Sequence, residues 1–76
     1  MEKLLEILSE IKENVDFEAE KALIDDGIID SLDLMQLISE IESEFDVEVE
    51  MDNIVPENFN SAEAMMAMIE RLQDEA

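Results

Sequence analysis

The sequence predicts an all-α fold, a small antiparallel four-helix bundle made of three main helices, one short helix and a long first loop. The chain has 76 residues, so we expect a single domain over residues 1–76. In three segments the apolar residues recur at steps of three and four, which is the spacing of amphipathic helices. A brief alternation of apolar and acidic residues at 46–50 has no second strand to pair with, which argues against a sheet.

The first helix is predicted from Glu2 to Asn14. Glutamates lie off its apolar stripe, some of them as unfavourable like-charge pairs four residues apart, so we expect the helix to depend on packing. Residues 16–30 show no sustained period but are rich in apolar residues, and we expect them to pack across the end of the bundle. Within them Gly27, the only glycine, is a predicted turn residue with positive φ. The stripe consists of Leu4, Ile7, Leu8, Ile11 and Val15.

The second helix is predicted from Ser31 to Phe45. At about 100° per residue, one sector of this helix collects Leu34, Leu37, Ile38, Ile41 and Phe45. Leu32 projects nearly opposite that sector and Met35 lies at its margin, so we expect both side chains to face outward.

The remaining helices follow a loop that begins at Asp46. Pro56 is a suitable first residue for a short third helix. The fourth helix is predicted to begin at Asn60 or Ser61, because Asn60 and Glu63 have the spacing of a capping box. Its apolar stripe consists of Met65, Met68, Ile69 and Leu72. We interpret the methionines of this helix as core residues.

The composition excludes several classes of function. There is no cysteine and no histidine, so the chain lacks thiolates, the usual general base and the commonest metal ligand. Any thiol or acid–base chemistry would have to come from a cofactor or a partner. Adjacent aspartates such as Asp25 and Asp26 are expected by chance among 23 acidic residues, and no neighbouring residue marks one as an acid and the other as a base.

The charge is strongly acidic, with 23 Asp and Glu against 4 Lys and Arg and a net charge of −19. This surface repels nucleic acid and anionic lipid and attracts basic protein partners. We therefore expect no nucleic-acid partner and no membrane partner. We also expect a monomer. No apolar run approaches the ~20 residues of a membrane span, and the first residues lack the basic region of a signal peptide, so we expect a cytoplasmic protein.

Ser31, at the start of the second helix, allows two interpretations. Asp30 or Ser31 could accept a hydrogen bond from the first turn, and Asp33 completes capping-box spacing with Asp30. Alternatively, Ser31 could carry a phosphate ester, because the N–H groups and dipole of a helix N-terminus favour an anion. No base lies nearby in the sequence, so Ser31 suits an acceptor of a modification better than a catalytic nucleophile.

The loop after the second helix resembles an EF-hand in the spacing of its acids. Those acids are Asp46, Glu48, Glu50, Asp52 and Glu57. The sixth loop position requires glycine for its sharp turn, but it is Met51 here. We predict no specific metal site, and only weak, diffuse binding of divalent cations that relieves repulsion.

The segment GIIDSLDLMQLISEIESEFDVEV, residues 27–49, resembles the region around the modified serine of the acyl carrier protein family. Its most specific part is Asp30-Ser31-Leu32, and length, acidity and the long first loop extend the resemblance over nearly the whole chain. The resemblance implies that Ser31 carries a 4'-phosphopantetheine arm, attached by a phosphopantetheinyl transferase that uses coenzyme A and magnesium. The thiol of the arm would hold acyl or aminoacyl groups as thioesters for fatty-acid, polyketide or related biosynthesis, and the carrier itself would catalyse nothing.

The resemblance also implies partner-binding residues, at positions where family members meet the basic patches of loading and acyl-transferring enzymes. They are Asp30, Leu32, Asp33, Met35, Gln36 and Glu42. Ile28 and Ile29 depart from the GADSL of fatty-acid members, and PENF at 56–59 resembles carriers of D-alanyl and peptidyl type. We therefore expect a discrete aminoacyl, D-alanyl-type or specialised acyl carrier. Possible cargo-lining residues are Ile38, Ile54, Phe59, Ala64 and Met68.

Two other functions stay open from the sequence. The chain could be an unmodified acidic helical interaction module, which would not need the Ser31 hydroxyl. It could also be a divalent-ion buffer, which would show a single tight stoichiometric site in calorimetry.

Overall fold

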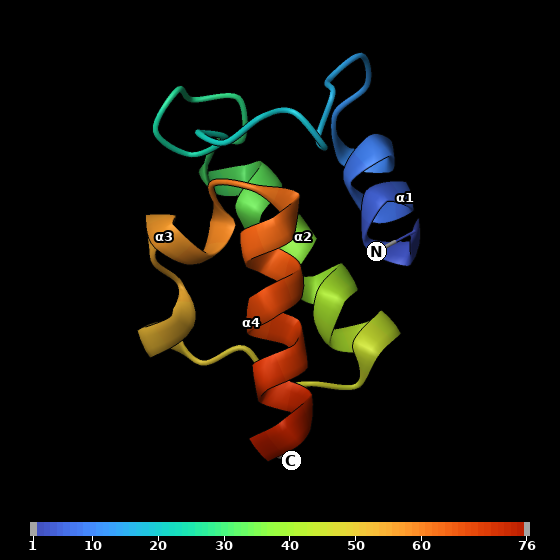
Figure 1. Cartoon of the computed structure of the whole chain (residues 1–76), viewed down its shortest axis with the longest axis vertical. Coiled ribbons are helices and arrows are strands. Elements are labelled where there is room, and N and C mark those ends of the chain that lie inside the picture. The colour runs from blue at the N-terminus through green and yellow to red at the C-terminus, as the bar shows by residue number, and fades with distance from the viewer. Residues whose placement is uncertain (1, 76) are drawn as a thin grey trace.

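The computed structural model describes residues 2–75, and these residues form helices and no strand (Figure 1). The elements are α1 (Glu2–Ile11), α2 (Ser31–Phe45), the 3-10 turn η1 (Met51–Asn53), α3 (Pro56–Phe59) and α4 (Ala62–Glu75). The prediction of an all-helical chain with three main helices and one short helix is confirmed. The second helix has the predicted bounds.

The long helices do not simply alternate in direction. In Figure 1, α1 runs upward, whereas α2 and α4 both run downward. Between them, η1 and α3 carry the chain back from the end of α2 to the start of α4. Because this connecting segment, residues 46–61, returns the chain to the end of the molecule where α2 began, α4 can point the same way as α2. α1 packs against both of them.

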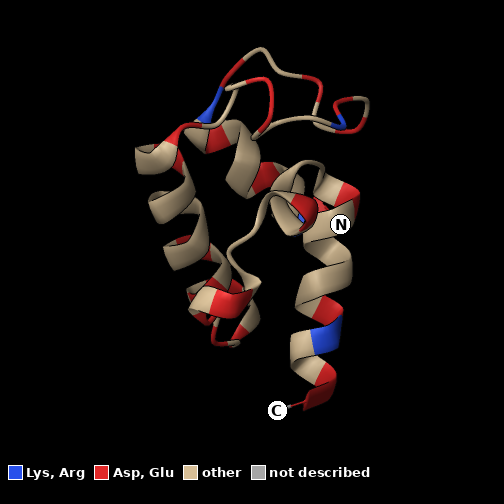
Figure 2. Cartoon of the chain, turned by 90° about the vertical axis from the view of Figure 1, so that its left-hand side faces the viewer, with Lys and Arg blue, Asp and Glu red and all other residues tan. Residues whose placement is uncertain are grey.

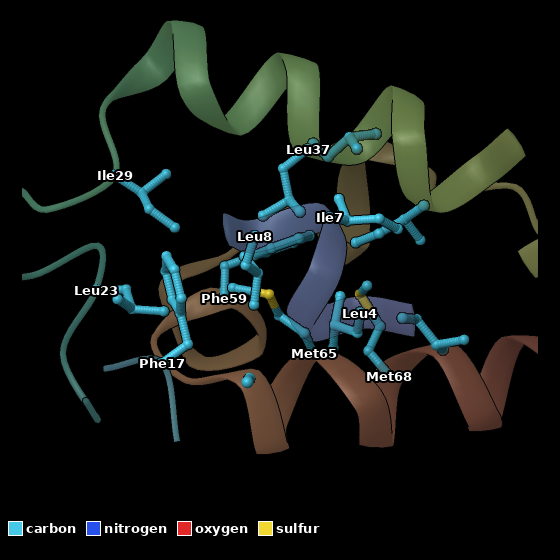
Figure 3. Packing of buried hydrophobic residues seen from close by; sticks show 14 of the residues in the cluster. Leu4, Ile7, Leu8, Phe17, Leu23, Ile29, Leu37, Phe59, Met65 and Met68 are labelled. Atoms are coloured by element: carbon cyan, nitrogen blue, oxygen red, sulfur yellow. The ribbon is translucent and has the colours of Figure 1, made fainter. Parts of the chain in front are cut away.

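The core consists of the predicted stripes together with part of the first loop (Figure 3). Phe17, Leu23 and Ile29 of the loop are all buried, which confirms that the loop packs onto the core. Full burial of each large apolar side chain contributes roughly 1.5–3 kcal/mol, and a domain this small depends on every such residue. From the helices, the buried apolar residues are Leu4, Ile7, Leu8, Leu37, Ile38, Ile41, Phe59, Ala62, Met65, Met68 and Ile69.

α1 ends at Ile11 and not at Asn14 as the stripe suggested. The Lys12 N–H still donates to the Leu8 carbonyl at 2.9 Å, but Asn14 has φ of 63°. A left-handed residue cannot continue a right-handed helix, and asparagine tolerates that conformation better than most residues. The apolar period continued to Val15 because Val15 still packs against the core from the loop.

α4 begins with Ser61 as its capping residue. The Ser61 Oγ accepts a hydrogen bond from the Ala64 N–H at 3.0 Å. The capping box predicted between Asn60 and Glu63 is therefore wrong. Pro56 opens α3 as predicted.

The Asn60 side chain instead holds the first loop. Its Oδ1 accepts hydrogen bonds from the N–H groups of Ile24 at 3.0 Å and Asp25 at 3.1 Å. Its Nδ2 donates to Asp25 Oδ2 at 3.2 Å, and its carbonyl accepts from the Leu23 N–H at 2.9 Å. Gly27 has φ of 73°, as predicted for a turn. The loop that leads to Ser31 is thus tied to the corner between α3 and α4.

Candidate functional site

Ser31 is the first residue of α2 and is exposed. The start of α2 adjoins the first loop (Figure 1). Asp30 before it has an extended backbone and caps the helix. Its Oδ1 accepts a hydrogen bond from the Asp33 N–H at 2.9 Å, and Asp33 Oδ2 accepts from the Asp30 N–H at 3.4 Å. Asp30, and not Ser31, therefore caps α2. Within residues 2–75 the Ser31 hydroxyl takes part in no hydrogen bond, so it is free to react.

Hydrogen bonds to this cap favour its ionised form. The hydrogen bond from the Asp33 amide, more than any other effect, lowers the pKa of Asp30 below its ordinary value. The Asp33 side chain, the Lys12 cation and the Leu32 N–H lower that pKa further, while desolvation opposes them. Lys12 also pairs with Asp33, with 3.1 Å between Nζ and Oδ2. This ion pair joins the end of α1 to the start of α2.

Two large apolar side chains lie exposed beside the serine, as predicted. Leu32 is 82% exposed and Met35 is 68% exposed. Gln36 and Asp30 are also exposed. These four side chains are accessible to a partner, and their role in binding stays a prediction.

The other two predicted partner residues are engaged within the chain. Asp33 is half-buried, accepts a hydrogen bond from the Asp30 N–H and pairs with Lys12. The Glu42 Oε2 accepts a hydrogen bond from the Val49 N–H at 2.9 Å. Sequence reasoning missed Lys12 and Asn60, and no local pattern could have revealed them, because their contacts lie far away along the chain.

The remaining candidates lie away from Ser31. Asp46, Glu48 and Glu50 border an open hollow of about 440 Å³ beside the C-terminal end of α4. Across residues 2–75, no group of three or more potential ligands could hold a metal ion.

Of the possible cargo-lining residues, Phe59 and Met68 are each 1% exposed and belong to the closed core, as does the buried Ile38, whereas Ile54 and Ala64 are half-buried. Over the same part of the chain, every helix is too short or too polar to span a bilayer.

Comparison with known proteins identifies the family. The family described as "Phosphopantetheine attachment site" matches residues 2–69. D-alanyl carrier proteins from Streptococcus equi subspecies zooepidemicus and subspecies equi are 38% identical to this chain over 61 residues. The match covers 80% of this chain and 77% of each relative. No solved structure matches the chain significantly. The chain therefore belongs to the phosphopantetheine carrier proteins, non-catalytic proteins that bear a covalent 4'-phosphopantetheine and are substrates of a phosphopantetheinyl transferase.

Proposed function

We propose that Ser31 is the residue that carries the 4'-phosphopantetheine arm, and that the chain delivers an aminoacyl or short acyl group bound to the arm as a thioester. One observation carries this proposal. Ser31 is exposed at the first position of α2, and Asp30 caps the helix, so the Ser31 hydroxyl is not needed as a cap.

The start of α2 suits a phosphodiester for a physical reason. The first N–H groups of a helix point toward its N-terminus and favour an anion there. Asp30 and Asp33 add negative charge, but each is held by a hydrogen bond to the backbone, and Lys12 offsets Asp33. In the attachment step, the Ser31 Oγ loses its proton and bonds to the pantetheine-bearing phosphorus of coenzyme A. The nucleotide phosphate of coenzyme A leaves as that bond forms.

An aminoacyl cargo is favoured over a long acyl chain. The relatives that match this chain are named D-alanyl carrier proteins. In addition, Phe59 and Met68 are almost fully buried, so an acyl chain could enter between them only by displacing well-packed side chains. A small polar group that stays outside on the arm requires no such opening.

The partners are expected to be the phosphopantetheinyl transferase, an enzyme that loads the aminoacyl or acyl group, and an enzyme that receives it. The net charge of −19 speeds the encounter with partners that present basic patches. This steering acts over the whole molecule and weakens as salt is added.

The attachment is tested by incubating the apo protein with a phosphopantetheinyl transferase, coenzyme A and magnesium, followed by mass spectrometry of the intact chain. The wild type should gain one arm. Ser31→Ala should gain none, whereas Ser43→Ala, a change at another exposed serine of α2, should be modified like the wild type. Modification of Ser31→Ala, or none of the wild type under conditions that modify a known carrier, would refute the proposal.

The cargo is tested on protein isolated from cells. The mass of the group released from the arm by mild thiolysis should be that of an amino acid or, failing that, of a short acyl group. A fatty acyl or polyketide mass would overturn the aminoacyl assignment while leaving Ser31 as the attachment residue. If the unmodified interaction module were the correct function, Ser31→Ala would retain full activity in cells.

A further inference from the structure

Most acidic residues of α2 already have a partner inside the molecule. The helix contains four acids. Asp33 pairs with Lys12 at 3.1 Å, and Glu44 pairs with Lys3 at 3.3 Å, measured from Nζ to the carboxylate oxygen. Glu42 accepts the Val49 N–H at 2.9 Å. Of the four, Glu40 alone makes no such contact with any residue from 2 to 75. Lys3 of α1 and Lys12, which directly follows α1, are thus paired with acids of α2.

The surface next to Ser31 is consequently more apolar than the composition suggests. Leu32 and Met35 are its most exposed large side chains, and Gln36 beside them is neutral. Asp30, which caps the helix, is the exposed acid directly beside Ser31, and further exposed acids lie in the first loop. Figure 2 shows acidic positions along the first loop, where Asp16 and Asp26 are exposed.

We propose that Lys12, with a smaller contribution from Lys3, determines partner specificity by masking the acids of α2. This inference rests on the proposed function. The face of α2 that exposes Leu32 and Met35 would then bind partner enzymes through an apolar surface. Partners that recognise this helix by its negative charge would bind it less well, because Lys12 already pairs with Asp33.

The physical basis is an exchange of ion pairs. A partner cation that binds the Asp33 carboxylate must compete with the Lys12 ammonium, whose Nζ lies 3.1 Å from Oδ2. One partly exposed ion pair is then replaced by another, which yields little net gain. The Asp33 Oδ2 also accepts the Asp30 N–H, which leaves less of the carboxylate for a newcomer. Glu44 lies about 20 Å along the helix from Ser31, at 1.5 Å per residue, so Lys3 affects a partner docked at the serine less than Lys12 does.

The test compares three substitutions that each remove one positive charge. Lys12→Gln unmasks Asp33, Lys3→Gln unmasks Glu44, and Lys21→Gln is the matched control. Lys21 pairs with Glu63 of α4 at 3.2 Å, and both of those side chains are more than half exposed. The probe is a phosphopantetheinyl transferase with a basic docking surface, assayed with coenzyme A and magnesium over a range of carrier concentrations.

At low salt, Lys12→Gln should lower the KM for the carrier about two- to fivefold, and this decrease should become smaller as salt is added. Lys3→Gln should lower KM less, and Lys21→Gln should leave it unchanged. Lys12→Arg keeps the ion pair and should behave like the wild type. Circular dichroism confirms that each variant is folded.

Equal KM changes in Lys12→Gln and Lys21→Gln would show that only net charge matters, and would overturn the inference. An increase in KM for Lys12→Gln would also overturn it. The proposed function is tested separately, because at saturating transferase every lysine variant should gain the arm at Ser31. Failure of that modification refutes the attachment residue, whereas failure of the KM ranking among fully modified variants refutes only the masking role.

Discussion

Replacing Asn60 by alanine should loosen the first loop and thereby the approach to Ser31. The Asn60 side chain accepts hydrogen bonds from two backbone N–H groups, of Ile24 and Asp25, and donates one to the Asp25 carboxylate. Alanine removes all three, while the carbonyl of residue 60 can still accept from the Leu23 N–H. The loop would then be held mainly by its apolar residues.

The cost follows from the burial of each group that loses its partner. The Ile24 N–H is partly buried, and leaving such a donor unsatisfied costs about 1–3 kcal/mol. The two groups of Asp25 are exposed and can bond to water, so their loss adds little. We expect a decrease of about 2 kcal/mol in the free energy of unfolding, which for a domain of this size lowers Tm by roughly 8–16 °C.

The assay is urea unfolding together with amide hydrogen exchange. Asn58→Ala is the matched control, because the Asn58 Nδ2 donates a single hydrogen bond to the Asn53 carbonyl at 2.8 Å. It should cost about 1 kcal/mol and leave exchange at Ile24 unchanged, whereas Asn60→Ala should accelerate that exchange. If Asn60→Ala were no more destabilising than Asn58→Ala, or if the Ile24 amide stayed protected, our account of the loop would be wrong.

Three further predictions concern the helix caps and the charge. Ser61→Ala removes the acceptor for the Ala64 N–H and should lower the free energy of unfolding by about 1 kcal/mol in urea titrations, and an unchanged midpoint would contradict this. Folding lowers the pKa of Asp30 below its ordinary value of 3.8. At pH values above 3.8 the ionised carboxylate therefore stabilises the fold, and this stabilisation is lost as the pH falls through the folded-state pKa. The Tm of the wild type relative to Asp30→Asn should therefore decline on acidification below about pH 4, and a constant difference would refute the assignment. Moderate salt or magnesium should raise Tm by screening repulsion at net charge −19, and calorimetry that shows a flat or falling Tm would mean that self-repulsion is weak.

Several features of this protein could be predicted from short stretches of sequence. The apolar spacing located the helices and their buried stripes, and it placed Leu32 and Met35 on the surface. Asp30 and Asp33 had the spacing of the capping box that the structure contains. Such features depend on contacts three or four residues apart, so the local sequence is enough to predict them.

The local pattern failed where the chain leaves a helix or turns back on itself. The apolar stripe of α1 continued past Ile11, although Asn14 had already left the helical conformation. The spacing of Asn60 and Glu63 suggested that Asn60 caps α4. In the structure the Asn60 side chain accepts a hydrogen bond from the Ile24 N–H of the first loop, and the neighbouring Ser61 caps the helix.

The residue pattern alone was enough to predict the helices, the core stripes, the strongly acidic surface and the serine at the start of α2. The folded chain was needed to show that α2 and α4 point the same way, that Asn60 holds the loop before Ser31, and that Lys12 and Lys3 pair with acids of α2. The reason is physical: these contacts join residues far apart in the sequence, and they form only where packing of the core brings distant segments together.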